Sequence, residues 1–129
     1  MSELRQALEN GKFVVTGEIG PPKGVDLNGC LQDTEILRDH VTAVNVTDLQ
    51  SAVLRIGSMA VSARLRDKGL EPVFQLTCRD RNRLALQSEL LSAWILGFAL
   101  GLAVARTRRL STARGRDLGC LRRGLVGYP

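Results

Sequence analysis

Glu18 is the residue whose surroundings in the sequence most favour acid–base chemistry. It stands beside the last residue of an apolar run, residues 13–19 (FVVTGEI), which a Gly-Pro-Pro sequence ends. A carboxyl group at the end of a buried strand loses solvation, which favours its neutral form and suits it to donate a proton. The same pattern fits a structural carboxylate that caps a loop or pairs with Lys23 or Arg79. Both interpretations stay open from the residues alone.

Polar side chains also follow the next two apolar runs. Thr47 and Asp48 come directly after residues 41–46 (VTAVNV), where short polar side chains either hydrogen-bond a cofactor or cap the following helix. A third run, residues 72–78 (PVFQLTC), leads into a turn with three arginines and Asp80. That turn could hold a phosphate, or Asp80 could cap the next helix while the arginines are solvated.

The elements that would position these side chains repeat along the chain. Apolar, β-branched runs centre near Val15, Val44 and Leu76, about 30 residues apart, which is the length of one strand–helix unit. Helical runs separate them, the second of which extends from Ala52 to Arg66, and residues 102–104 fall where a fourth strand is due. Such alternation predicts an α/β fold with a parallel sheet.

The number of units decides between two architectures. Three to four βα units fit into residues 1–104, against the eight that a complete barrel of roughly 250 residues needs. We therefore predict a partial (β/α)8 TIM barrel. The alternative is a flavodoxin-like open sheet, but its first loop should offer backbone N–H donors, and residues 20–24 (GPPKG) carry two prolines. In a barrel, the carboxyl ends of the strands meet at one mouth, where the polar residues would gather.

Charge is spread unevenly over the 129 residues. The formal net charge is +5, yet residues 101–129 hold seven arginines and one acid, Asp117. We expect residues 105–129 to form a basic, disordered tail. Nucleic-acid binding by this tail is not favoured, because Tyr128 is its only aromatic residue.

The uncharged stretch 90–105 falls short of the about 20 residues of a membrane-spanning helix, so we predict no membrane anchor.

Cysteine and histidine usage excludes several classes of site. Cys30, Cys78 and Cys120 form no C-x-x-C pair, which argues against a zinc site or a disulfide framework. His40 is the single histidine, so neither a Ser-His pair nor a histidine metal site can be assembled. Residues 1–12 lack the apolar core of a secretory signal. We predict no metal and a cytoplasmic location.

Three stretches together resemble the amino-terminal part of the methylenetetrahydrofolate reductase family. They are residues 12–24 (KFVVTGEIGPPKG), 41–60 (VTAVNVTDLQSAVLRIGSMA) and 69–97 (GLEPVFQLTCRDRNRLALQSELLSAWILG). The resemblance implies a (β/α)8 barrel that binds FAD at its mouth and reduces 5,10-methylenetetrahydrofolate to 5-methyltetrahydrofolate. NAD(P)H or another donor would first reduce the flavin.

The resemblance also implies roles for individual residues. In that family the glutamate of an E-x-x-P-P motif is the general acid, and Glu18 occupies that position here. The threonine that ends the second strand contacts the flavin, which matches Thr47. The remaining positions implied as cofactor contacts lie after the second strand and along or after the third: Asp48, Gln75, Leu76, Thr77, Arg79 and Asp80.

The sequence departs from the family after about residue 98. The family has a Gly-Asp pair after the fourth strand, where this chain reads ARTRR at 105–109. We hypothesise a truncation or a reading-frame change, and expect the isolated chain to be an inactive or incomplete enzyme. An open apolar face would make it associate with itself and bind FAD weakly. The alternative is a non-enzymatic interaction protein with a basic tail or a membrane anchor.

Overall fold

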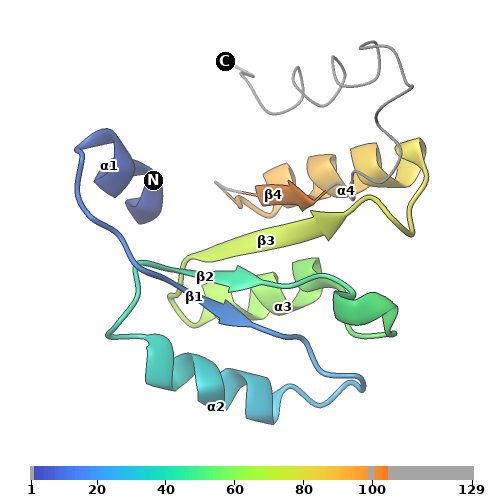
Figure 1. Ribbon diagram of the computed structural model, residues 1–129, viewed down its shortest axis with the longest axis horizontal. Coiled ribbons are helices and arrows are strands. Elements are labelled where there is room, and N and C mark those ends of the chain that lie inside the picture. The colour runs from blue at the N-terminus through green and yellow to red at the C-terminus, as the bar shows by residue number, and fades with distance from the viewer. Residues whose placement is uncertain (1, 99–100, 105–129) are drawn as a thin grey trace.

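Four parallel strands alternate with helices in the computed structural model, which describes residues 2–98 and the backbone of 101–104 (Figure 1). In chain order the elements are α1 (Glu3–Glu9), β1 (Thr16–Ile19), α2 (Asn28–Leu37), β2 (Ala43–Val46), the 3-10 turn η1 (Gln50–Ala52), α3 (Ser58–Asp67), β3 (Pro72–Thr77), α4 (Arg83–Ile95) and β4 (Gly101–Val104). The predicted α/β alternation is confirmed. The expected tail at 105–129 lies outside the described residues.

The strands lie side by side in the order β1-β2-β3-β4, the order in which they occur in the chain. All three pairings are parallel. A flavodoxin-like sheet would place its first strand between the second and third, so this order contradicts that alternative. Consecutive order is the order of a (β/α)8 barrel, but the described strands do not close into one.

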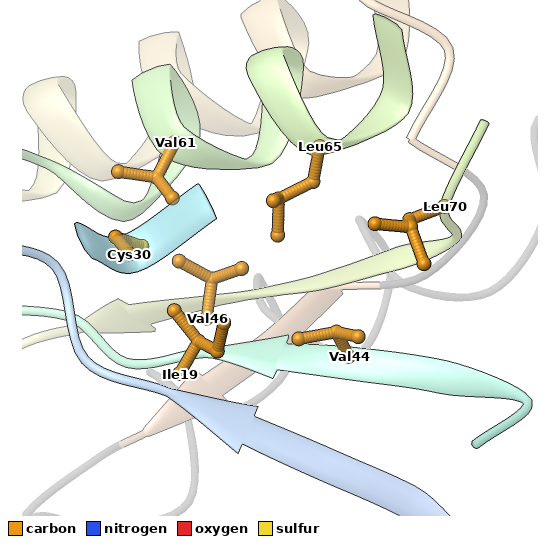
Figure 2. Close-up of a cluster of buried hydrophobic side chains, with 7 residues drawn as sticks. All are labelled: Ile19, Cys30, Val44, Val46, Val61, Leu65 and Leu70. Atoms are coloured by element: carbon orange, nitrogen blue, oxygen red, sulfur yellow. The ribbon is translucent and has the colours of Figure 1, made fainter. Parts of the chain in front are cut away.

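One face of the sheet packs against α2 and α3 through an apolar cluster (Figure 2). Val44 and Val46 on β2 point to this face because alternate side chains of a strand point to the same side. Val61 and Leu65 of α3 meet them, and all four side chains are fully buried. Ile19, Cys30 and Leu70 complete the cluster. Burial raises the pKa of the Cys30 thiol, with a smaller contribution from Asp33.

A second cluster joins β3 to α4. Phe74 and Leu76 pack with Ala93 and Phe98, and the rings of Phe74 and Phe98 are 5.7 Å apart. Phe98 reaches this position because Gly97, two residues after the end of α4, has a φ of +72° that lets the chain turn back. The Phe98 amide donates to the Ala93 carbonyl at 3.0 Å, as in a Schellman cap.

Two elements begin later than the sequence pattern predicted. Phe13 is 94% exposed and β1 starts at Thr16, although the apolar run begins three residues earlier. The helix predicted from residue 52 begins only at Ser58, because Leu49, Ser51 and Ala52 have left-handed backbone angles. Apolar and helix-favouring residues continue into the loops that precede these elements, so the sequence pattern placed the starts of β1 and α3 too early.

Helix α1 covers the amino-terminal end of the opposite face. Leu4 is buried there against Ala43 and Val73, the inward-facing residues of β2 and β3 at that end. Glu71, just before β3, accepts hydrogen bonds from the Ser2 hydroxyl and from the amides of Glu3 (2.6 Å) and Leu4 (3.1 Å). Among the described residues, α1 lies toward the amino-terminal ends of the strands and away from their carboxyl ends (Figure 1).

Replacing Glu71 should release α1. We expect Glu71→Gln to lower the free energy of unfolding by about 1–3 kcal/mol, because it removes charge-assisted hydrogen bonds to the half-buried start of the chain. Hydrogen exchange of the α1 amides should accelerate. Glu9→Gln is the matched control, since Glu9 pairs only with exposed Arg5. Equal protection of α1 in both variants would contradict the anchoring role of Glu71.

Candidate functional site

A polar cleft of about 240 Å³ lies at the carboxyl ends of β1, β2 and β3. Its lining consists of side chains from these strand ends and the loops that follow them: Glu18, Thr47, Asp48, Gln50, Gln75, Thr77 and Arg79. Six of these seven are positions at which the sequence predicted chemistry. The parallel register of the strands brings them together. Glu18 of β1 lies opposite Asn45 of β2, and β3 extends the same rows of side chains across the sheet.

Glu18 lies on the rim of this cleft and is exposed. It makes no ion pair within the described part of the chain, so the pairing with Lys23 or Arg79 that the sequence left open is not observed. The enclosure that we expected around its carboxyl group is not provided by the described strands either. As far as the described residues go, Glu18 is therefore an unpaired carboxyl group facing an open polar cleft.

Asp48 is held in place at the base of the cleft. Its side chain is 1% exposed, and it accepts a hydrogen bond from the Thr77 amide at 2.9 Å. Arg81 binds both carboxylate oxygens, with 3.2 Å between Nη2 and Oδ1. Burial lowers the pKa of Arg81, but hydrogen bonds to Asp48 and Glu89 outweigh it, so the pKa is raised. Asp48 thus joins the end of β2 to the end of β3.

The residues at the ends of β2 and β3 divide between the two faces of the sheet. Thr47 is buried, and its amide and hydroxyl both donate to the Ile19 carbonyl, at 3.0 and 3.3 Å. Gln75 and Thr77 line the cleft. Leu76 lies between them in sequence and points away into the cluster with α4, where it is 1% exposed. Its side chain is therefore not brought to the cleft.

The loop after β3 places Arg79 at the cleft and Asp80 beside it. Arg79 forms an ion pair with Asp80 and donates to the Leu49 carbonyl at 2.9 Å. The hydrogen bond that Arg79 Nε donates to the Asp80 carboxylate lowers the pKa of Asp80. The suggestion that Asp80 caps the next helix is wrong, because Asn82 does so by accepting from the Ala85 amide at 2.9 Å. Asp80 instead neutralises the charge of Arg79.

Sequence reasoning missed Gln50. Its side chain lines the cleft because the backbone turns sharply at η1, where Leu49, Ser51 and Ala52 have φ values between 44° and 61°. Left-handed angles are unfavourable for residues with a Cβ atom, and here glycine, which adopts them freely, is absent. No local sequence signal announces such a turn. Arg81 was missed as well, since the sequence showed only a run of arginines.

Comparison with family models shows to which family the chain belongs. The model described as methylenetetrahydrofolate reductase matches residues 3–106. The chain belongs to the methylenetetrahydrofolate reductase family. The match begins at α1 and extends past β4, so all the described strands lie within it. No curated protein and no solved structure matches the chain significantly.

FAD is the cofactor of the methylenetetrahydrofolate reductase family, and the cleft fits part of it. The lining offers an amide at Gln75, hydroxyls at Thr47 and Thr77, and a guanidinium at Arg79. Amides and hydroxyls suit the carbonyls and nitrogens of a flavin ring, and a guanidinium suits a phosphate. At about 240 Å³ the cleft is smaller than most ligand pockets, which span roughly 300–1,000 Å³. The cleft formed by the described residues is therefore too small to enclose a whole FAD molecule.

None of the helices in the described part of the chain has the length and apolar character of a membrane span, and the stretch 90–105, for which a membrane anchor was considered, runs partly outside that part. No cluster of metal-ligating side chains occurs within residues 2–98. Cys30 is a free buried thiol and Cys78 is free and half-buried, while Cys120 lies beyond the described part.

Proposed function

We propose that this chain supplies the amino-terminal wall of a flavin-dependent active site that reduces 5,10-methylenetetrahydrofolate to 5-methyltetrahydrofolate. Membership of the reductase family supports this reaction class. FAD, when bound, supplies the hydride and receives it beforehand from NAD(P)H or another donor. On the same basis we propose a cytoplasmic location, a folate substrate and no nucleic-acid partner.

The observation that carries the proposal is the gathering of Glu18, Gln75 and Thr77 in one cleft. These residues come from strands that are far apart in the sequence, and the cleft lies at the carboxyl ends of parallel strands. Reactive groups of (β/α)8 enzymes occupy that end. The opposite end of the same face is covered by α1.

Glu18 would act as the proton donor. Opening the five-membered ring of the folate requires a proton on the departing nitrogen, and Glu18 presents a carboxyl group unpaired among the described residues. Gln75 and Thr47 would orient the flavin ring, and Arg79 a phosphate. Asp48 would act by fixing the loops, because both of its oxygens are occupied by Arg81 and the Thr77 amide.

The open cleft leads us to expect weak FAD binding by this chain. Titration of the full-length chain with FAD, followed by flavin fluorescence and absorbance, should show saturable binding that Gln75→Ala weakens several-fold. Gln32→Ala, on the exposed side of α2, is the control and should bind FAD like the unaltered chain. Absence of any binding would contradict the cofactor assignment. Tight stoichiometric FAD in the purified protein would show instead that no further wall is needed.

A further inference from the structure

Arg81 lies outside the cleft, yet it joins the two strand ends that border the cleft, those of β2 and β3, to helix α4. Its side chain is 13% exposed. The guanidinium donates to Asp48, to the Thr77 carbonyl at 3.1 Å, and to Glu89 of α4 at 2.9 Å. The ends of β2 and β3 are therefore tied to α4 through one buried side chain.

Asp48 connects Arg81 to the residues that line the cleft. Its carboxylate is almost fully buried, so it needs a countercharge, and Arg81 is the cation that contacts it directly. The same carboxylate holds the Thr77 amide at 2.9 Å. Asp48 also follows Thr47 directly in the chain, so its position sets where two of the cleft-lining residues stand relative to Glu18.

We infer that Arg81 is a positioning residue of the cofactor site, which holds Asp48 so that Thr47 and Thr77 keep their places in the cleft. This inference rests on the proposed function, because it concerns the wall that would bind FAD. Arg81 makes two ion pairs, and the pair with Glu89 faces the groove between α3 and α4 instead of the cleft. Asp48 and Glu89 therefore allow the positioning role of Arg81 to be tested separately from its general contribution to stability.

The test compares Arg81→Met with Glu89→Gln in the full-length chain. Arg81→Met removes both ion pairs of the guanidinium, whereas Glu89→Gln removes only the pair with Glu89 and leaves the pair between Arg81 and Asp48 intact. We expect Arg81→Met to weaken FAD binding by about tenfold or more, because displaced contacts sharply reduce productive binding. Glu89→Gln should change it by less than about twofold. Equal weakening in the two variants would overturn the inference.

A second measurement does not depend on FAD. Exchange of the Thr77 amide, followed by NMR, should accelerate in Arg81→Met and stay unchanged in Glu89→Gln. Should the chain bind no FAD while this difference is observed, the proposed function fails and the positioning role of Arg81 stands. If circular dichroism shows that Arg81→Met is unfolded, Arg81→Lys replaces it, since lysine keeps the charge but loses the two-pronged contact. Unaltered Thr77 exchange in the folded variant contradicts the inference.

Discussion

Glu18→Gln should abolish folate reduction while leaving reduction of the flavin by the nicotinamide nucleotide nearly unchanged. General acid catalysis contributes about 10²–10⁴-fold to the rate, and glutamine cannot supply the proton. The exposed carboxyl at the cleft rim lies on the same face as Gln75 and makes no ion pair in the described structure. Its removal should therefore affect the protonation step and little else.

The two half-reactions separate this role from a structural one. The chain, complemented with a polypeptide that supplies the remaining strands of a family barrel, would be reduced and then mixed with 5,10-methylenetetrahydrofolate in a stopped-flow instrument. Asp26→Asn is the matched control, because Asp26 is an exposed carboxylate of the loop after β1 that does not line the cleft. Loss of both half-reactions in Glu18→Gln with normal cofactor content would argue against the assigned role, as would an unchanged rate of folate reduction.

Leu65→Ala should cost the fold about 2–5 kcal/mol of unfolding free energy. Leu65 is fully buried between α3 and β2, and truncation leaves a cavity in the cluster with Val44 and Val46 (Figure 2). Such a loss is a large part of the 5–15 kcal/mol that typically stabilises a domain. Urea unfolding followed by circular dichroism measures the change.

The control for this prediction is the same substitution on an exposed helix position. Leu84 of α4 is 76% exposed, so Leu84→Ala should shift the unfolding free energy by no more than about 0.5 kcal/mol. Similar small effects of both substitutions would show that the helix-facing cluster does not form the core of the folded chain.

The sequence pattern predicted the strands and the cleft well, because both follow from local rules. β-branched runs predicted β3 to within one residue and β2 to within two residues at its start. The rule that parallel strands present their carboxyl ends at one edge gathered Glu18, Thr47 and Gln75 correctly. Residue 76 was grouped with its neighbours, although strand alternation turns its side chain to the other face.

The parts that the sequence did not predict depend on tertiary structure. The ion pair of Asp48 and Arg81 joins residues 33 positions apart, and only the parallel pairing of β2 and β3 brings them together. The left-handed turn at Leu49 is tolerated because Arg79 holds its carbonyl. Neither feature has a signature within a short window. The closed barrel implied by the family is not formed by the described strands, which provide four of its eight.

The contact between Glu71 and the first residues of the chain imposes an order on biosynthesis. These partners are separated by 67 to 69 positions, so α1 lacks its anchor at Glu71 until the start of β3 has left the ribosome. Helix α1 is thus secured only after β1, α2 and β2 have been synthesised. Until then, Leu4 and Ala43 stay accessible to chaperones in the nascent chain.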